Sequence, residues 1–324
     1  MGHHIKNRLA IIGAGRITSA HIEAALEAGF DIAAICARPH SKNATRLAAK
    51  YGIEYSAASL EELLNHNFDA YSITVSTDAQ IEVLSKILPF NKPCLIEKPI
   101  SIYGNKIQNV LDHFNTKKLI VGLNRRHYEA VLTFKDFVMN CNESLSFSVT
   151  IPEYSWDLDP NPNRAKNYFV DNSVHVIDLV NFIFGKIEFI KTIKSPNYEL
   201  SNIAAIVSTE KNFVGSINVS FSASANTAIE AFTKGKYIQL KPMEKLSIYE
   251  GMVTKPANFE AAYKTYTPVL TQFVEPKIQT NAIKPGFLGQ YSDLLRICHS
   301  ERDVISARIL DTLEAVNICR KIVD

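Results

Sequence analysis

A strand, a glycine turn and a helix open the chain, and this order constrains the fold more than any other feature. Residues 9–12 form a buried parallel strand by pattern, and Gly13-Ala14-Gly15-Arg16-Ile17 follows directly, before a helix with an apolar face. Gly13 allows a tight turn, Gly15 lets a pyrophosphate approach the backbone, and the free amides of the helix N-terminus bind that anion. The order predicts a dinucleotide-binding Rossmann unit, although Thr18 stands where a third glycine is usual.

The residues after the second strand bear on the choice of cofactor. The strand at residues 31–36 is followed by Ala37 and Arg38, with Ser41 close by. NAD-preferring sites usually place an acidic residue here to bind the ribose 2′-hydroxyl. A guanidinium and a hydroxyl suit a 2′-phosphate better. The sequence therefore favours NADP over NAD, unless Arg38 is only a solvated loop residue.

Strands and helices continue to alternate up to residue 123. Further strands are expected at residues 70–75, 94–96 and 119–122, and helices at residues 41–51, 60–64, 81–88 and 105–114. Alternation at this spacing predicts a doubly wound parallel sheet, an α/β fold. We therefore assign residues 1–123 to a dinucleotide-binding Rossmann domain.

A lysine stands where the strand at residues 94–96 ends. In an open parallel sheet, ligands bind at the carboxyl ends of the strands, so Glu97-Lys98-Pro99 is expected at a ligand crevice. Pro99 also biases Lys98 toward an extended backbone. On the tripeptide alone, the alternative is a solvated lysine beside a turn proline.

After residue 123 the pattern changes to that of an α+β domain. A helix at residues 128–139 precedes an alternating strand at 145–151, and a loop rich in proline and asparagine leads to a helix at 171–184 that ends at Gly185. Residues 187–250 predict successive antiparallel strands. Residues 293–323 predict helix that packs back on the body. Residues 124–324 are thus expected to form a substrate-binding and oligomerisation domain with a large, mostly antiparallel sheet.

Three polar residues share one face of the helix at residues 171–184. Asp171, His175 and Asp178 are spaced i, i+4 and i+7. We expect His175 in the first turn, where the helix field disfavours the imidazolium, while the neighbouring carboxylates favour it. A neutral histidine there could act as a base, with Asp171 or Asp178 orienting one of its nitrogens. The alternative is a polar helix face with a structural histidine.

Composition argues against several other classes of protein. A formal net charge of +2 gives no reason to expect a nucleic-acid or membrane partner. No apolar run approaches the ~20 residues of a transmembrane span, and the N-terminus lacks an apolar signal core, so a cytoplasmic location is expected. Five cysteines without a Cys-x-x-Cys pair suggest free thiols, and no metal site is expected.

Together these motifs resemble the glucose-fructose oxidoreductase / inositol dehydrogenase / MocA (Gfo/Idh/MocA) family of NAD(P)-dependent sugar oxidoreductases, over nearly the whole chain. The motifs that carry the resemblance are Gly13-Ala14-Gly15-Arg16-Ile17 with His21, Glu97-Lys98-Pro99, Gly122-Leu123-Asn124-Arg125-Arg126, residues 171–178 and Thr233-Lys234-Gly235-Lys236. The chain departs from the family at Thr18, at Ser173, where a glycine is common, and at residues 75–80, which lack the usual proline and histidine.

The resemblance implies hydride transfer between the nicotinamide and a secondary alcohol or ketone carbon of a sugar, polyol or nucleotide sugar. Lys98 would bind and polarise the reacting oxygen, His175 would carry the proton, and Asp171 would position the histidine or the substrate. The implied cofactor contacts are Gly13, Gly15, Arg16, Ile17, Arg38, Ser76, Glu97 and Lys98.

The resemblance also suggests where the substrate binds. The candidates share a cationic or aromatic side chain, which would suit an anionic or nucleotide-linked sugar: Arg125, Arg126, Tyr154, Trp156, Lys166 and Tyr168. Arg126 could equally form an ion pair at a domain interface. Family members pair through the second-domain sheet, which implies a homodimer or homotetramer.

Two other functions fit the same motifs. One is a catalytically silent regulator that senses a cofactor or sugar, although the retained Lys98, Asp171 and His175 argue against it. The other is an enzyme that cleaves glycosides with the help of tightly bound NAD.

Overall fold

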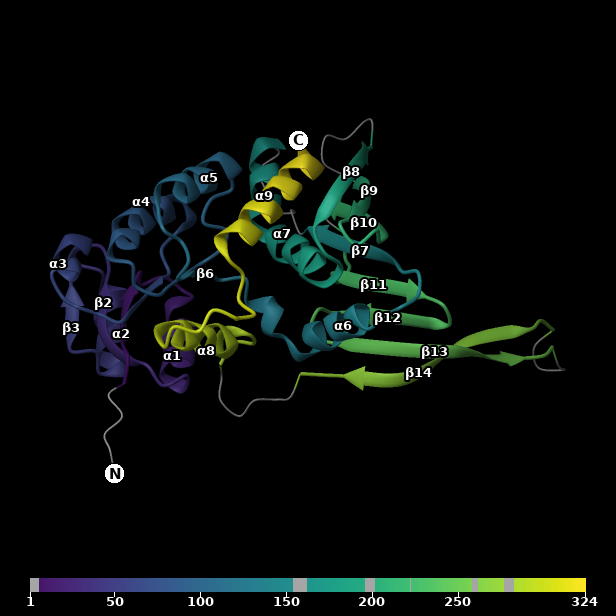
Figure 1. Ribbon diagram of the computed structural model, residues 1–324, viewed down its shortest axis with the longest axis horizontal. Helices are drawn as coiled ribbons and strands as arrows, with labels where there is room; N and C mark the ends of the chain where they lie inside the picture. Colours follow the sequence, from purple (N-terminus) through teal and green to yellow (C-terminus); the bar gives the residue numbers. More distant parts are fainter. Residues whose placement is uncertain (1–5, 154–161, 196–201, 222, 258–261, 277–282) are drawn as a thin grey trace, which may run out of the picture. The chain divides into compact units, whose positions relative to one another are not determined.

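The computed structural model describes residues 6–153, 162–195, 202–221, 223–257, 262–276 and 283–324 (Figure 1). The chain divides into two compact units. Unit 1 is Met1–His127 with Gln279–Asn317, and unit 2 is Tyr128–Ile278 with Ile318–Asp324. Unit 1 thus takes in residues 279–317, which the sequence analysis assigns to the second domain. Helix α8 (Phe287–Cys298) lies in this stretch and packs on helix α1 (Thr18–Glu27).

Unit 1 contains a six-stranded parallel sheet with the strand order β3-β2-β1-β4-β5-β6. The strands are β1 (Arg8–Ile12), β2 (Asp31–Cys36), β3 (Tyr55–Ala57), β4 (Ala70–Ile73), β5 (Cys94–Ile96) and β6 (Leu119–Val121). The order reverses between β1 and β4, which makes a topological switch point at the carboxyl ends of the strands. The predicted doubly wound parallel sheet is confirmed. Only the three-residue strand β3 was not anticipated.

The core of unit 1 joins the sheet to α1 and α8. Leu9 and Ile11 of β1, Ile22 of α1, Phe30, and Tyr291 of α8 are all fully buried in one cluster. Burial of each such side chain contributes roughly 1.5–3 kcal/mol. The other helices of the unit are α2 (Lys42–Tyr51), α3 (Leu60–Leu64), α4 (Thr77–Ile87), α5 (Gly104–His113) and the 3₁₀ turns η1 (Leu88–Phe90) and η2 (Asn124–His127).

Unit 2 contains an eight-stranded sheet with the order β14-β13-β12-β11-β7-β10-β9-β8. Its strands are β7 (Ser146–Glu153), β8 (Ile187–Lys194), β9 (Asn202–Thr209), β10 (Val214–Phe221), β11 (Ala228–Thr233), β12 (Lys236–Leu240), β13 (Leu246–Lys255) and β14 (Thr265–Val274). Every neighbouring pair is antiparallel except β7 and β10. The predicted mostly antiparallel sheet is confirmed.

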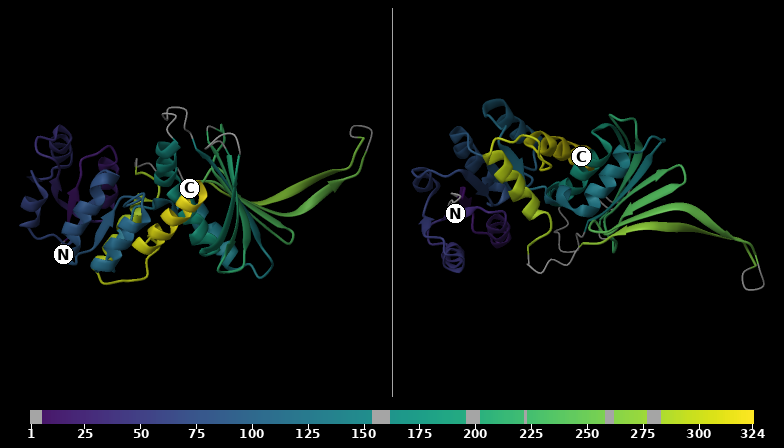
Figure 2. Two further views of the ribbon diagram at one scale, coloured as in Figure 1. Left: turned by 90° about the horizontal axis from the view of Figure 1, so that it is seen from above. Right: turned by 60° about the horizontal axis from the view of Figure 1, so that its bottom comes forward.

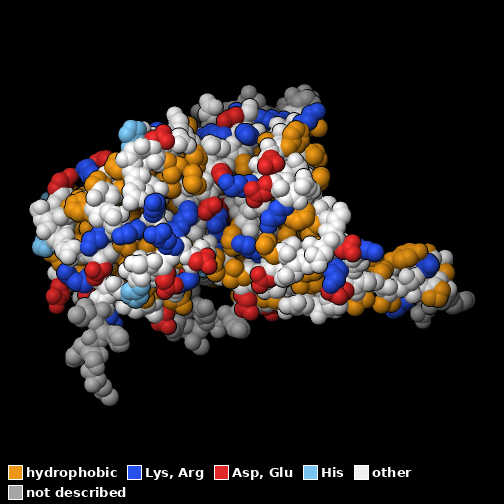
Figure 3. All heavy atoms as spheres, viewed as in Figure 1, with side chains coloured by type: hydrophobic (Ala, Val, Ile, Leu, Met, Phe, Trp, Pro, Cys, Tyr) orange, Lys and Arg blue, Asp and Glu red, His pale blue; other side chains and the backbone are white. Residues whose placement is uncertain are grey.

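One face of this sheet is covered by helices α6 (Glu129–Met139) and α7 (Pro162–Phe184) (Figure 2). Strand β9 shows the resulting alternation, since Ile203, Ala205 and Val207 are buried and the residues between them are more exposed. The hairpin of β13 and β14 extends past the residue-250 limit that the sequence predicted. It carries exposed apolar side chains, among them Met252 and Leu270 (Figure 3).

Helix α7 begins at Pro162, nine residues before the predicted start. Proline is favoured in a first helical turn, so the chain from Pro162 onward is helix where the sequence predicted a loop. Arg164, Lys166 and Tyr168 therefore lie on α7. His175 lies in the interior of the helix, so the prediction that it occupies the first turn is wrong, and the field of the helix N-terminus does not act on it.

The C-terminal stretch is two helices rather than one. Helix α8 ends at Cys298 and α9 (Ile309–Val323) begins after a non-helical segment, whereas the sequence predicted helix throughout residues 293–323. The segment is held by Asp293, whose Oδ2 accepts a hydrogen bond of 2.8 Å from the amide of Ser306. Helix α9 starts in unit 1 and ends in unit 2.

Candidate cofactor pocket and catalytic groups

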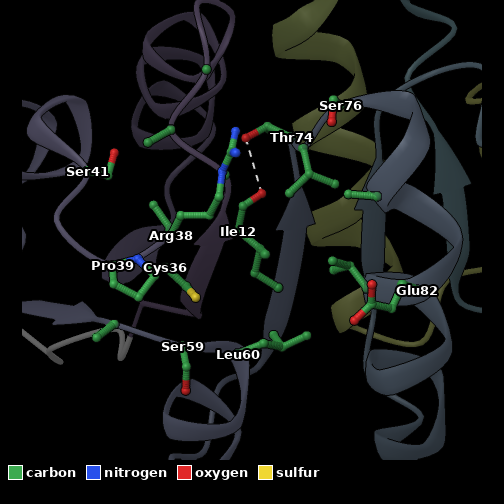
Figure 4. Close-up of a pocket in the computed structure, with 18 of the residues that line it drawn as sticks. Ile12, Cys36, Arg38, Pro39, Ser41, Ser59, Leu60, Thr74, Ser76 and Glu82 are labelled. Carbon is green, nitrogen blue, oxygen red and sulfur yellow. Dashed lines mark hydrogen bonds between the residues drawn. The ribbon is translucent and has the colours of Figure 1, made fainter.

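The glycine turn after β1 forms one wall of a cavity of about 670 Å³ in unit 1 (Figure 4). Gly13 has a φ of 118°, and a Cβ at this position would lie 2.7 Å from the backbone carbon of Thr74. Only glycine fits there, since both the backbone angle and the neighbouring strand exclude a side chain. At Gly15 a Cβ would meet nothing closer than the Thr74 oxygen at 3.8 Å, so the backbone faces open space.

Thr18 occupies the place of the usual third glycine without loosening the packing. Its side chain is fully buried, and its hydroxyl lies 3.0 Å from that of Thr74. Thr74 also donates to the carbonyl of Ile12, at 3.3 Å (Figure 4). The two hydroxyls therefore join α1 to Thr74, the residue after β4. A glycine at position 18 would have allowed only a backbone contact there.

Four of the predicted cofactor residues line this cavity, namely Gly13, Gly15, Arg38 and Ser76. Arg16, Ile17, Glu97 and Lys98 are not part of its lining. Ser41, whose hydroxyl caps α2 by accepting from the Ala44 amide at 3.3 Å, lies on the wall with the exposed Arg38 (Figure 4).

The sequence analysis missed several other lining residues because they come from distant segments. They include Ser59, Glu61, Glu82 and Lys86. Lys86 forms ion pairs with Glu61 at 2.9 Å and with Glu82 at 3.2 Å. The open glycine turn, the helix N-terminus and the arginine after β2 together form a donor set that fits the phosphate groups of a dinucleotide.

Glu97 is held within unit 1 by a chain of buried polar groups. Its Oε1 lies 2.9 Å from Nε2 of His21, and Nδ1 of His21 lies 3.0 Å from the hydroxyl of Tyr291. That hydroxyl lies 2.7 Å from Oγ of Ser72. Sequence reasoning gave His21 no role of its own, because its partner is far away in the chain.

This environment keeps Glu97 ionised. Burial alone would raise its pKa, but the hydrogen bond from His21 and the charges of His21, Lys98 and Lys284 outweigh burial and lower the pKa. The side chain is only 15% exposed. Glu97 therefore presents a fixed negative charge beside Lys98.

Lys98 lies at the carboxyl end of β5 and is half-buried, which disfavours the alternative of a fully solvated lysine. The Lys98–Pro99 peptide bond is cis. Ile100, which follows, is fully buried and has a φ of 68°, an unusual angle for a β-branched residue. A positive φ at a β-branched residue is a strained conformation, and such residues are concentrated at functional sites.

The second group of predicted catalytic residues belongs to unit 2. Asp171 and His175 are half-buried on α7, and Asp178 is buried. The fully buried Glu153, the last residue of β7, accepts hydrogen bonds from the side chains of Asn172, at 2.9 Å, and Ser173. Ser173 thus uses its hydroxyl to fix α7 on β7. Glu153 was not identified from the sequence.

The predicted substrate residues fall in different surroundings. Arg126 is buried and forms an ion pair with Asp311 at 3.3 Å, both within unit 1, whereas Arg125 is half-buried. On α7, Lys166 lies 3.8 Å from Asp324, and burial raises the pKa of Tyr168. Tyr154 and Trp156 lie outside the described residues.

In the part of the chain that the structure describes, no group of three or more histidine, cysteine, aspartate or glutamate side chains is arranged to hold a metal ion. No helix in the described ranges combines the length and apolar character needed to cross a membrane.

Residues 7–125 match the Gfo/Idh/MocA oxidoreductase family, described by its NAD-binding Rossmann fold. A curated relative is the rhizopine catabolism protein MocA of Rhizobium meliloti, 23% identical over 185 residues. That match covers 55% of this chain and 57% of the relative, so it spans little more than half of either protein.

Solved structures share the fold of the whole chain. Levoglucosan dehydrogenase in complex with NADH and levoglucosan is 16% identical, with a TM-score of 0.77 over 98% of this chain and 96% of that chain. UDP-N-acetylglucosamine 3-dehydrogenase from Acidithiobacillus ferrooxidans is 16% identical, with a TM-score of 0.72 over 98% and 97%. An oxidoreductase from Thermotoga maritima is 19% identical, with a TM-score of 0.74 over 98% and 96%.

Proposed function

We propose that the chain, whose residues 7–125 match the NAD-binding Rossmann fold of the Gfo/Idh/MocA oxidoreductase family, is an NAD(P)-dependent dehydrogenase or reductase of a sugar, polyol or nucleotide sugar. The observation that carries the proposal is the half-buried Lys98 at the carboxyl end of β5, in a Rossmann unit that also has an open glycine turn. Two of the similar structures named above are dehydrogenases of levoglucosan and of UDP-N-acetylglucosamine by their titles, which supports this substrate class.

Lys98 is proposed to hold and polarise the oxygen of the reacting carbon. A positioned ammonium stabilises the negative charge that develops on that oxygen during reaction. The bound nicotinamide supplies or accepts the hydride. The ionised Glu97 beside Lys98 is held in place by its hydrogen bond with His21.

His175 is proposed to accept the proton of the substrate hydroxyl during oxidation and to return it during reduction, with Asp171 orienting the histidine or the substrate. The position of both side chains depends on α7. The hydrogen bonds from Asn172 and Ser173 to Glu153 fix the helix between Asp171 and His175.

Substitution of Lys98 tests this proposal most directly. We expect Lys98→Ala to lower kcat about 10²–10³-fold, as removal of one oxyanion-stabilising donor does elsewhere, in a turnover screen over polyols, aldoses and nucleotide sugars with NAD and NADP. Lys117→Ala, at an exposed lysine of the same unit, is the matched control and should change nothing. Unchanged turnover in Lys98→Ala would contradict the role of Lys98, and cofactor binding by the unaltered protein without turnover of any sugar would favour a regulator. Failure to release reduced cofactor with the oxidised sugar would favour the glycoside-cleaving enzyme.

The preference for NADP over NAD is a further part of the proposal. It is supported by Arg38 and Ser41 on the cavity wall and by the lack of an acidic residue directly after β2. We expect Arg38→Ala to weaken NADPH binding about 10-fold, the loss of one charge-assisted contact, and to leave NADH binding unchanged. Titration of cofactor fluorescence measures both. Equal affinity of the unaltered protein for the two cofactors would contradict the preference.

A homodimer or homotetramer formed through the unit 2 sheet is proposed as well. Phe232, Tyr237 and Tyr249 stack across β11, β12 and β13, with ring centroids 5.1 and 5.4 Å apart, and remain partly exposed. Such an aromatic row is typical of an interface. The molar mass in solution, from light scattering, tests this proposal.

A further inference from the structure

The Ala14 carbonyl, in the glycine turn after β1, is tied to helix α2 by a side chain. The side-chain amide of Asn43 donates a hydrogen bond to this carbonyl. Ala14 lies on the wall of the cavity described above, and Asn43 is half-buried near the start of α2. The preceding residue, Gly13, is held differently, because its backbone amide donates to the carbonyl of Cys36 at 2.8 Å. Asn43 therefore holds the part of the turn that follows Gly13.

An arginine fixes the direction in which the Asn43 side-chain amide points. Arg46, about one turn later on α2, donates to Oδ1 of Asn43 from Nε at 3.2 Å and from Nη2 at 2.8 Å. An asparagine side chain has one accepting end and one donating end, and a guanidinium can only donate. The two bonds from Arg46 therefore occupy the oxygen of Asn43 and leave its NH2 group to face Ala14.

The bond at Ala14 also sets the orientation of the next backbone amide. The peptide bond between Ala14 and Gly15 is trans, and in a planar trans peptide the carbonyl and the N–H point in opposite directions. A carbonyl that points at Asn43 thus turns the N–H of Gly15 away from Asn43. Gly15 is exposed on the cavity wall. Among the described residues, no backbone carbonyl accepts from the amides of Gly15, Arg16 or Ile17.

A glycine at position 15 makes this peptide easy to turn over. Glycine accepts a φ of either sign, so rotation of the peptide meets no steric penalty at Gly15. Rotation would present the Ala14 carbonyl in place of the Gly15 N–H, and a carbonyl oxygen repels the phosphate oxygens that an N–H attracts. The hydrogen bond from Asn43 opposes the rotation, because turning the peptide over would break the bond and leave the half-buried NH2 group without its acceptor.

We propose that Asn43 is a positioning residue for the dinucleotide, which keeps the amides of the glycine turn available to the pyrophosphate, and that Arg46 acts through Asn43. The inference rests on the cofactor binding of the proposed function. A concavity of successive backbone N–H groups binds an anion well, and one reversed peptide would place an acceptor among these donors. Helix α2 thus takes part in recognition of the pyrophosphate without touching it.

The test compares the dissociation constants of NADPH, NADH, ADP and adenosine, measured by calorimetry and by displacement. We expect Asn43→Ala to weaken binding of both dinucleotides and of ADP about 3- to 10-fold, the range for loss of one neutral hydrogen bond, and to leave adenosine binding unchanged. Arg46→Ala should weaken dinucleotide binding about 3-fold by itself and not at all when Asn43→Ala is already present. Asn109→Ala, at an exposed asparagine of α5 in the same unit, is the matched control and should change nothing.

Several outcomes would overturn the inference. One is unchanged dinucleotide affinity in Asn43→Ala, with or without a lower urea midpoint, since a lower midpoint alone would show only a structural role. Another is an equal loss of affinity for adenosine and for ADP. An Arg46→Ala loss of the same size in the Asn43→Ala background would show that the arginine acts through its own charge. Dinucleotide binding without turnover of any sugar would leave the role of Asn43 standing and contradict the proposed dehydrogenase. No binding of either dinucleotide by the unaltered protein would overturn both.

Discussion

Each unit has one carboxylate that lies close to proposed catalytic residues, either in the chain or through contact with their helix. The two carboxylates, Glu97 and Glu153, differ in the kind of side chain that contacts them. Glu97 precedes Lys98 and is bound by His21, among the charges of Lys98 and Lys284. Glu153 lies against α7 and is bound by an amide and a hydroxyl. The charges of His21, Lys98 and Lys284 act on Glu97, whereas the two donors described at Glu153 are a neutral amide and a neutral hydroxyl. The comparison teaches that charges act on the described surroundings of Glu97, and that neutral side chains of α7 donate the hydrogen bonds described at Glu153.

The largest expected loss of stability comes from a substitution in the glycine turn of unit 1, which neither carboxylate contacts. Gly13→Ala places a Cβ 2.7 Å from the backbone of Thr74 at a φ of 118°, so we expect a loss of about 4 kcal/mol in the free energy of unfolding, together with loss of NADH binding. Gly29→Ala is the matched control, since Gly29 also has a positive φ, of 100°, but nothing lies within 4 Å. It should cost about 1 kcal/mol. Urea unfolding followed by circular dichroism measures both, and equal losses would contradict the steric argument.

Removal of the unit 2 carboxylate comes next in size. Glu153→Ala leaves the buried hydroxyl of Ser173 and the amide of Asn172 without their acceptor, which should cost about 3 kcal/mol of unfolding free energy. Glu153→Gln keeps an acceptor oxygen and should cost less. Glu188→Ala is the control, because it removes an exposed carboxylate from β8 of the same unit. A loss no larger than that of the Glu188 control would contradict the role of these two hydrogen bonds.

The smallest expected effect is the pH dependence of the contribution that Glu97 makes to the free energy of unfolding. It tests whether charge holds this carboxylate. A carboxyl group whose pKa is lower in the folded protein stabilises the fold above its unfolded pKa, here about 4.5, and that contribution is lost as the pH falls through the folded value. We expect Glu97→Gln to lose about 1 kcal/mol at pH 7 through the weaker bond to His21. The difference in unfolding free energy between Glu97→Gln and the unaltered protein should become smaller below pH 4.5.

Urea midpoints between pH 3.5 and pH 7 measure that difference. The exposed Glu143 provides the matched control, because Glu143→Gln removes a carboxylate from the surface of unit 2. A difference in unfolding free energy that stays constant from pH 3.5 to pH 7 would mean that Glu97 is not held by charge.

The features that sequence reasoning predicted well are those in which neighbours along the chain are also neighbours in space. The β1 strand, the Gly13 turn and α1 form one continuous segment, and Lys98 directly follows β5. Hydrophobic periodicity and glycine placement are enough for such segments. The start of α7 was missed because Pro162 fits both a loop and a first helical turn, and only packing of the helix decides between them.

The groups that complete the site come from segments far apart in the chain. His21 meets Glu97, and Glu153 meets Ser173, although the partners are 76 and 20 positions apart in the chain. Lys284 approaches Glu97 only because α8 packs on α1 in unit 1. No local pattern marks such pairs, since each depends on how the sheet and its helices are stacked.

The sequence by itself determined the parallel Rossmann sheet, the glycine turn, the lysine at the end of β5 and the aspartate and histidine on one helix face, because these follow from chain-local periodicity and turn chemistry. Only the tertiary structure decided which charges surround that lysine and what fixes the helix. Ion pairs and buried hydrogen bonds join residues whose proximity is created by folding, and their strength depends on burial that the chain acquires only when it is packed.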